Sequence, residues 1–489
     1  MQQEPANFLK MRGPNLLLSG ALLSIAAALI VYSQTQAYAF DEGFHLLAAQ
    51  LIGQGKRPYL DFLFPQTPLN AYWNAAWMHI FGQSWRVSHA MAALMTWGAV
   101  ILASDYVYRR LREPRWRTCA ALFTAFAVGL NVAVFEYGTL GQAYGLCLFL
   151  IVAAFRVSIL AVERRSLLMP MLAGFFSIAA AASSLLTAPV APVLLIWMLV
   201  VNRVGNRASK LAAFILGAVI GSAPVLWLFV KSPRQVIFGI LQYHLFYRQV
   251  EWSGALAHDL EVALGWIDYG PAVMLILLSV GGLWFVYRSD WERSGKNEFY
   301  LCGCLALAET IHLLNAHPTF SRYFLFTVPF LAIPAGVGLC AYGERLSQVG
   351  TPRTVVALAC CLMAFGIVKL AYDGRDDICW SDMEEVAAKV EEVAPPGSSL
   401  YAEEIIYFLT RRTPPPGMEH HDAHKLNLPL ADAAALHVLP RKELKQMIDA
   451  GAFSTVETSY DDEIELFGLA KLYSKKAELS AGTVFWERK

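Results

Sequence analysis

The stretch YAFDEGFHLLAAQLIGQGKRPYLDFLFPQTPLNAYW, residues 38–73, follows the first long apolar run of the chain. Asp41 and Glu42 stand just beyond that run, and residues 43–52 carry apolar side chains spaced as on one face of a helix. A carboxylate pair beside a membrane helix, backed by a helix lying on the surface, indicates a reaction centre at the membrane–water boundary. The alternative is a solvated loop whose charges only mark a helix end.

The composition around this stretch is that of a membrane protein. The 489 residues are 56% hydrophobic and 16% charged, which is too apolar for a soluble protein and typical of a polytopic one. The net charge is zero and no nucleic-acid-binding motif is present, so we expect no nucleic-acid partner. The eight cysteines show no metal-ligand spacing, and all but Cys379 lie in or beside apolar runs, which indicates small core residues.

Apolar runs that could cross a bilayer, which takes about 20 residues, recur along the chain. We expect about eleven spans, at residues 13–32, 89–108, 118–135, 142–160, 169–186, 189–201, 211–230, 271–287, 299–314, 320–342 and 354–371. The first could instead be a cleaved signal peptide, but its apolar core exceeds the usual ~7–15 residues. The Pro-containing segment 187–192 is expected to separate two short spans; a kink in one longer helix would change the parity.

Basic residues gather in every second loop, and the positive-inside rule places these loops in the cytoplasm. The set comprises Arg109, Arg110, Arg112, Arg115, Arg117, Arg164, Arg165, Arg203, Arg207, Lys210, Arg288, Arg293, Lys296, Arg345 and Arg353. With eleven spans, the first outer loop (34–88), the loop 231–269 and everything after residue 371 then face outward.

The pattern changes at residue 372, where apolar runs shorten and charges become frequent. We therefore divide the chain into a transmembrane module, 1–371, and a small soluble α/β domain, 372–489. In this domain we expect helices at 381–393, 403–409 and 441–450, and strands at 399–402, 436–439 and 455–458. Residues 243–248 read as a second amphipathic outer-loop helix.

Two ordered motifs resemble a known superfamily. The first combines the Asp-Glu pair at 41–42 with GQGKRPYLDF (53–62), PLNAYW (68–73) and FGQS (81–84); the second is HPTFSRY (317–323). This order resembles the membrane glycosyltransferases of the GT-C superfamily. The nearest branch is the bacterial one similar to protein O-mannosyltransferases, the lipid A aminoarabinose transferase and RgtA/B/C/D-like enzymes. The chain departs from it at Thr67, where relatives often carry proline. In the second outer loop, where many carry an acidic residue, it offers Glu136 and then Gln142, which leaves the second acidic position open.

The resemblance implies an enzyme that transfers a sugar from a polyprenyl-phosphate donor to an acceptor hydroxyl, with inversion. The acceptor would be a lipid, a glycan or a protein, and the place the outer face of the bacterial cytoplasmic membrane. A hydroxyl attacks efficiently only when a base takes its proton, and we expect Asp41 in that role. Glu42 would orient Asp41, hold a cation or bind the acceptor. A divalent cation, Mg²⁺ or Mn²⁺, is an open alternative.

Further substrate-binding candidates follow from the same chemistry. The leaving phosphate needs cationic groups, and Arg322, His317, Lys56 and Arg57 could supply them, with Arg322 best placed. Asp61 could bind hydroxyl groups, Tyr59 could stack on a sugar, and Tyr323 belongs to the second motif. Each of these residues also has a non-functional explanation. Arg322 could be a helix-end arginine that snorkels to the membrane surface, and Lys56 and Arg57 could simply be solvated. The tyrosines could belong to an aromatic belt at the membrane interface. His420, His421 and His424 could attract a metal, although a solvated loop explains them more simply.

Two other classes of protein stay open. A transporter or flippase of a lipid-linked or small solute would also have many helices, but it typically shows inverted repeats and helices interrupted at mid-membrane. The sequence shows no repeat, and its charges gather at the outer edge. A non-catalytic envelope-assembly protein could keep the same architecture after losing the site.

Overall fold

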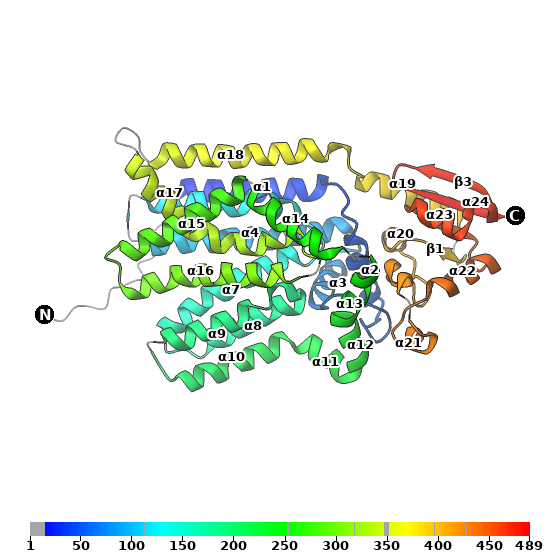
Figure 1. Cartoon of the computed structure of the whole chain (residues 1–489), viewed down its shortest axis with the longest axis horizontal. Helices are drawn as coiled ribbons and strands as arrows, with labels where there is room; N and C mark the ends of the chain where they lie inside the picture. The colour runs from blue at the N-terminus through cyan, green and yellow to red at the C-terminus, as the bar shows by residue number, and fades with distance from the viewer. Residues whose placement is uncertain are drawn as a thin grey trace.

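The computed structural model describes residues 15–489 except 112, 115, 203, 252–253, 269, 317, 347–351, 396 and 427. Arg112, Arg115, Arg203 and His317, which carry expectations stated above, lie outside the described residues. The long helices lie side by side in one bundle, and a smaller unit containing all the strands described caps one end of it (Figure 1).

The bundle contains a helix for every apolar run predicted from the sequence. The helices are α1 (Leu16–Thr35), α4 (Trp85–Arg110), α5 (Arg117–Gly129), α7 (Tyr144–Glu163), α8 (Leu168–Ser183), α9 (Val190–Val201), α10 (Arg207–Gly221), α11 (Ala223–Lys231), α15 (Gly270–Arg288), α16 (Arg293–Leu314), α17 (Val328–Leu346) and α18 (Pro352–Asp373). The segment between α8 and α9 is broken as expected, by the 3-10 turn η1 (Leu185–Thr187).

Within the described residues, six helices are long and apolar enough to cross a membrane. The number rises to seven if α10 and α11, bent by 62° at their junction, form one span. The chain is therefore a multi-pass membrane protein, while the count of eleven crossings stays a prediction.

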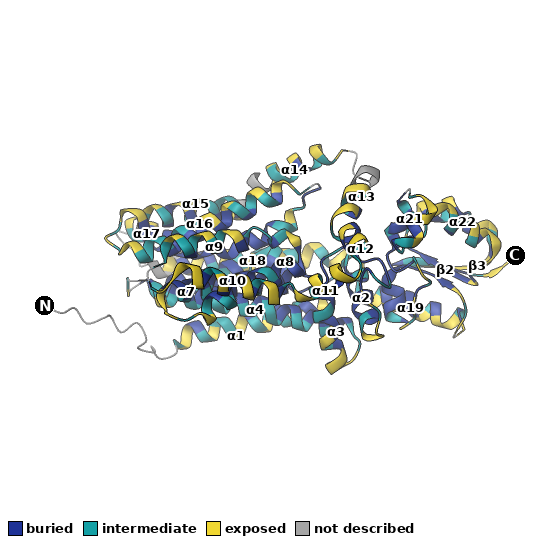
Figure 2. Ribbon diagram, turned by 90° about the horizontal axis from the view of Figure 1, so that it is seen from below, coloured by how far each residue is buried: buried dark blue, intermediate teal, exposed yellow. Residues whose placement is uncertain are grey.

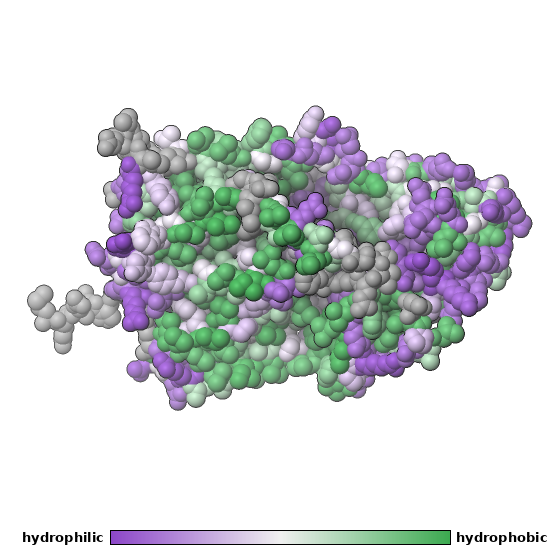
Figure 3. Space-filling model, in the orientation of Figure 1, coloured by the Kyte–Doolittle hydropathy of each residue, from purple (hydrophilic) through white to green (hydrophobic). Residues whose placement is uncertain are grey.

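The outward surface of the bundle is apolar, as a lipid-facing surface must be. On α18, Leu362 is 57% exposed and Phe365 67% exposed. Exposed faces run along the rim of the bundle while its interior is buried (Figure 2), and hydrophobic residues cover its middle with hydrophilic ones towards both ends (Figure 3). An apolar surface of this extent would not persist in water.

Short elements gather at the end of the bundle that faces the smaller unit. They are α2 (Glu42–Gly53), α3 (Leu69–Phe81), α6 (Val132–Tyr137), α12 (Pro233–Ile237), η2 (Phe238–Gln242), α13 (Tyr243–Glu251), α14 (Ala255–Asp268) and η3 (Ser321–Thr327). The helices predicted at 43–52 and 243–248 are thus confirmed as α2 and α13. However, residues from Glu42 to Leu51 are nearly all buried, so α2 lies between the two parts of the molecule rather than on a surface.

The C-terminal unit is an α/β domain with a small sheet. Its elements are η4 (Gly374–Asp376), α19 (Trp380–Val393), β1 (Leu400–Tyr401), α20 (Glu404–Leu409), η5 (His421–Lys425), α21 (Leu430–Ala435), α22 (Arg441–Ala450), β2 (Thr455–Thr458), α23 (Asp461–Phe467), α24 (Leu469–Leu472), β3 (Tyr473–Leu479) and β4 (Gly482–Arg488). The strand order is β1-β2-β4-β3, with β1 parallel to β2 and the other pairs antiparallel.

The three helices and two of the three strands predicted here are confirmed. The strand predicted at 436–439 is wrong: Leu436 and Val438 are buried against Leu63 and Phe238 without pairing to any strand described.

One apolar core joins this domain to the outer loops. It contains Leu46 and Leu51 of α2, Ala71 of α3, Val386 of α19 and Ile405 of α20. Because both parts contribute to this core, the domain packs directly against the end of the bundle. The boundary at residue 371 stays a prediction.

Candidate functional site

The two sequence motifs meet at an ion pair. Asp41 occupies the N-cap position of α2 but makes no capping hydrogen bond, so its carboxylate is free for another partner. Arg322 of η3 donates from Nη2 to Asp41 Oδ2 at 2.8 Å. The side chain of Asp41 is 43% exposed and that of Arg322 24% exposed. Two groups separated by 281 positions in sequence are thus brought together at the end of the bundle.

Aromatic rings hold the guanidinium of Arg322 in place. Its carbon lies 4.4 Å from the ring centroid of Phe320, 5.8 Å from that of Tyr323 and 6.0 Å from that of Tyr137. The Nε atom is buried and has no hydrogen-bond partner among the described residues.

Two cavities share this ion pair as part of their wall. The acidic cavity, of about 400 Å³, is lined by Tyr32, Gln36, Tyr38, Glu136, Tyr137 and Asp377, among others. The aromatic cavity, of about 260 Å³, is lined by Phe44, Tyr144, Tyr243, Phe320, Tyr323 and His420, among others. Both cavities are lined by Phe40, Asp41, Gln142 and Arg322. A group bound in either cavity could therefore reach the carboxylate and the guanidinium.

Glu136 adds a second carboxyl group to the acidic cavity. Burial raises the pKa of this carboxyl above its ordinary value, and a hydrogen bond from Tyr137 opposes the rise in part. Glu136, which the sequence offers in the second outer loop, lies at the wall of the acidic cavity.

Glu42 lies behind Asp41 and lines neither cavity. It is fully buried; its Oε1 accepts from the Gly141 amide at 2.5 Å and lies 2.5 Å from His89 Nε2. The other nitrogen of His89 lies 2.5 Å from the Ser33 carbonyl oxygen. These contacts tie the start of α2 to α1, to α4 and to the loop before α7, so Glu42 is placed to fix the position of Asp41.

The candidates between residues 56 and 61 lie away from both cavities. Arg57 pairs with Asp61 at 2.8 Å, and that hydrogen bond lowers the pKa of Asp61. Lys56 lies 4.0 Å from Glu419. Tyr59 is 1% exposed and its hydroxyl donates to the Gln66 carbonyl, so its ring faces the protein core. The structure brings Asp41, Arg322 and Tyr323 together and leaves these four apart from them.

The C-terminal domain supplies cavity residues that the sequence did not single out for this site. His420 lies 2.8 Å from the Tyr243 hydroxyl through Nε2 and 3.1 Å from Glu404 Oε1 through Nδ1. Asp422, two residues on, also lines the aromatic cavity. The packing of the domain over the bundle places His420 and Asp422 at this cavity, and no local sequence motif predicts that position.

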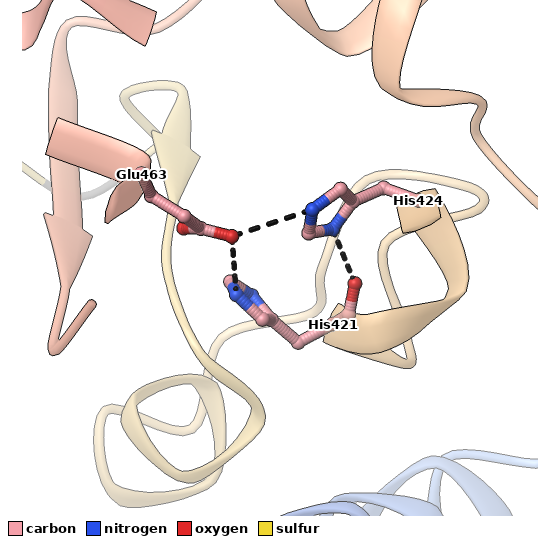
Figure 4. A group of neighbouring side chains, drawn as sticks. All are labelled: His421, His424 and Glu463. Carbon is pink, nitrogen blue, oxygen red and sulfur yellow. Dashed lines mark hydrogen bonds and ion pairs between the residues drawn. The ribbon is translucent and has the colours of Figure 1, made fainter. Parts of the chain in front are cut away.

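A potential metal-binding group lies nearby rather than at Asp41 and Glu42. Among the described residues, one set of three side chains could jointly hold a metal ion: His421, His424 and Glu463 (Figure 4). Asp41 and Glu42 belong to no such set, because the carboxylate of Glu42 is turned into the protein.

The comparisons with known proteins concern the fold. No family model matches the sequence, and a search of curated proteins found no match. Among solved structures, the chain is similar to ArnT from Cupriavidus metallidurans in the apo state, with a TM-score of 0.66, 16% identity and coverage of 96% of this chain and 97% of that one. The same protein bound to undecaprenyl phosphate gives a TM-score of 0.64 at 14% identity, with the same coverage.

An oligosaccharyltransferase from Archaeoglobus fulgidus, in complex with Zn and sulfate, matches with a TM-score of 0.52 and 15% identity. The match covers 81% of this chain and 62% of that one. These likenesses confirm the expected fold of the GT-C type, a helical membrane bundle with a small C-terminal sheet.

Proposed function

We propose that this chain, which has the GT-C fold, is a membrane glycosyltransferase that moves a sugar from a polyprenyl-phosphate donor to an acceptor hydroxyl. The observation that carries the proposal is the Asp41–Arg322 pair, which stands where two cavities meet. A transfer reaction needs two substrates whose reacting atoms approach one another beside a base and an anion-binding group. The similarity to an ArnT that was solved with undecaprenyl phosphate supports this class of donor.

In this reaction the acceptor oxygen forms a bond to the anomeric carbon while the carbon–oxygen bond to the phosphate breaks. Asp41 takes the proton of the hydroxyl, and the phosphate leaves with the electron pair of the broken bond. Arg322 then faces a phosphate whose negative charge has grown, so its attraction is stronger in the transition state than in the bound donor. Attack from the face opposite the phosphate inverts the anomeric configuration.

The linings of the cavities favour one assignment of the substrates. The aromatic cavity offers Phe44, Tyr144, Phe320 and Tyr323 around the guanidinium, which suits a phosphate carrying an apolar chain. The acidic cavity offers Glu136 and Asp377, which suit the hydroxyl groups of an acceptor. With the basic loops in the cytoplasm, both cavities would face the outer side of the bacterial cytoplasmic membrane.

The Asp41–Arg322 contact also implies an order of events. The two side chains neutralise one another at 2.8 Å. A donor phosphate would compete with the carboxylate for the guanidinium and free Asp41 to accept a proton. Donor binding would therefore activate the base, so that Asp41 becomes able to accept a proton only when a sugar donor is bound.

The test is transfer of labelled sugar from a polyprenyl-phosphate donor in proteoliposomes. Asp41→Asn should lower the rate by about 10²–10⁴, the usual contribution of a general base. Asp61→Asn is the matched control, since Asp61 belongs to the same outer loop but lines neither cavity, and it should keep most of the activity. Undiminished transfer by a folded Asp41→Asn variant would contradict the proposal. Solute uptake without any transfer would instead favour a transporter.

A further inference from the structure

We propose that His421, His424 and Glu463 form a buried binding site for Zn²⁺ inside the C-terminal domain. The two histidines belong to η5 and the glutamate to α23, and their candidate ligand atoms all lie within 4.8 Å of one another. His421 Nε2 is 2.9 Å and His424 Nε2 is 3.4 Å from the same oxygen, Glu463 Oε1 (Figure 4). Tetrahedral ligands at about 2.0–2.2 Å from zinc lie roughly 3.3–3.6 Å apart, so these two contacts are close to the spacing that a bound ion requires.

The groups behind these ligands are arranged to orient them. His424 donates from Nδ1 to the His421 carbonyl at 2.6 Å, which leaves the lone pair of its Nε2 directed at Glu463. Glu463 accepts at Oε2 from Thr458, at 3.0 Å, and from the Tyr401 hydroxyl, at 3.4 Å. Its other oxygen, Oε1, is the one that faces both imidazoles. Metal-bound histidines and carboxylates are characteristically held by a second group in this way.

The site is shielded from water. The side chains of His421, His424 and Glu463 are 2%, 4% and 3% exposed, respectively. His421 Nδ1 is also buried and has no hydrogen-bond partner in the described part of the chain. Because His424 donates from Nδ1, its Nε2 meets Glu463 Oε1 as one acceptor facing another, which is costly in a buried site without a cation between them. A bound cation would give the converging atoms a common partner.

The ligand types select the metal. Two imidazoles and one carboxylate are a ligand set that zinc accepts in tetrahedral geometry, with a fourth position for water. Magnesium and calcium prefer oxygen ligands and a higher coordination number, so this set is unsuited to them. The site therefore differs from the Mg²⁺ or Mn²⁺ considered for the carboxylates at 41–42.

The zinc would act on the cavity through the chain rather than by touching substrate. His420 and Asp422 flank His421, and both line the aromatic cavity. An ion joining η5 to α23 would fix the backbone on either side of His421 and hold these two side chains at the cavity wall. The inference concerns metal binding, so it can be tested without a transfer assay and stands or falls separately from the proposed function.

The experiment measures zinc in the full-length protein, purified in detergent through a tag without histidines, loaded with ZnSO₄ and then desalted. We expect about one zinc per chain in the native protein. The variants His424→Gln and Glu463→Gln should lose most of it. His79→Gln, which removes an exposed histidine of α3, is the matched control and should retain it. His424→Cys, which restores a zinc ligand, should recover binding.

A second readout separates loss of metal from loss of folding. Treatment of the native protein with EDTA should lower its melting temperature and added ZnSO₄ should restore it, whereas the Gln variants should respond to neither. Replacement of zinc by Co²⁺ should give the visible absorption of a tetrahedral site in the native protein. A folded native protein that retains no zinc after loading would overturn the proposal. Equal zinc content in the native protein and both Gln variants would do the same.

Discussion

Arg322 links the late sequence motif to the acidic end of α2, and its role can be tested by substitution. Arg322→Gln removes the charge that would meet the leaving phosphate and should lower kcat/KM for the donor by about 10²–10³. Arg322→Lys should recover part of the activity, because an ammonium group keeps the charge but lacks the two-pronged geometry. Steady-state kinetics at varied donor concentration measure both effects.

The control for Arg322 is Arg57→Gln. Arg57 is an arginine of the first outer loop that pairs with Asp61 and lines neither cavity. Its loss should leave the donor kinetics nearly unchanged. If Arg57→Gln lowered kcat/KM for the donor as much as Arg322→Gln, the phosphate would not be recognised by Arg322 where the two cavities meet.

Glu457 gives the C-terminal domain a predictable pH dependence. Its Oε2 accepts from the Glu403 amide at 3.0 Å, while Oε1 is buried and has no partner among the residues described. Burial, together with the charge of Glu403, raises the pKa of Glu457 well above its ordinary value of 4.5. The folded state therefore holds this proton more tightly than the unfolded state, and stability is lost as the pH rises from about 4.5 through the raised pKa.

Glu457→Gln keeps the shape and the acceptor oxygen but removes the ionisation. The melting temperature of the variant should therefore fall less than that of the native protein between mildly acidic and alkaline pH. Thermal unfolding followed in a series of buffers makes the comparison. If the melting temperatures of the native protein and the variant changed equally with pH, the carboxyl of Glu457 would have the same pKa in the folded and the unfolded state, which would contradict the prediction.

At the level of single residues, the sequence predicts which residues belong to a functional motif better than it predicts which of their side chains face a cavity. Asp41 and Arg322 could be found because each stands in an ordered motif, and the structure places them in contact. Tyr59 and Glu42 share those motifs, yet their side chains are buried away from the cavities. Which neighbour of a motif residue faces a cavity depends on how α2 packs on the rest of the molecule, and one sequence does not contain that packing explicitly.

The junction of α2 with α20 is the contact between elements on which the site depends. A Cβ atom at Gly43 would lie 3.0 Å from the Tyr38 hydroxyl and 3.3 Å from the Ile405 amide nitrogen, so no large side chain fits there. Gly43→Leu should destabilise the protein by about 1–3 kcal/mol, the usual cost of overpacking. Chemical unfolding monitored by tryptophan fluorescence measures the change.

Gly53 provides the matched control, because it ends the same helix and a Cβ atom there would meet nothing within 4 Å. Gly53→Leu should leave stability unchanged or slightly improved, since leucine favours a helix more than glycine does. If Gly43→Leu and Gly53→Leu lowered the stability equally, the close approach of α2 to α20 would not be the reason why position 43 excludes a large side chain.

Among the elements, the long apolar helices and the short strands β1 and β2 could be predicted from the sequence. Each apolar run expected to cross the membrane is helical over most of its length, because a segment in lipid must satisfy its backbone hydrogen bonds internally. Residues 436–439 resemble a strand by composition, but Leu436 and Val438 are buried by packing against the outer loops. The sequence pattern does not indicate the hairpin of β3 and β4, because β3 is an edge strand whose exposed residues include Lys475 and Lys476.

At the scale of the whole molecule, the site exists only where the membrane bundle and the C-terminal domain meet. The bundle supplies Tyr144 and η3, the first outer loop supplies Asp41, and the domain supplies His420. The order of these parts could be predicted from the sequence, while the outward placement of the domain stays a prediction. The shared apolar core that presses the domain onto α2 could not, since its members are scattered from residue 46 to residue 484.

The position of a bound polyprenyl phosphate tests the central claim most directly. A cryo-electron microscopy structure of the protein with polyprenyl phosphate should show the phosphate in the aromatic cavity, within hydrogen-bonding distance of the Arg322 guanidinium. The Asp41 carboxylate should be released from Arg322 and turned towards the acidic cavity. A phosphate bound at Lys56 and Arg57, or an Asp41–Arg322 pair left intact beside bound lipid, would contradict the proposed mechanism.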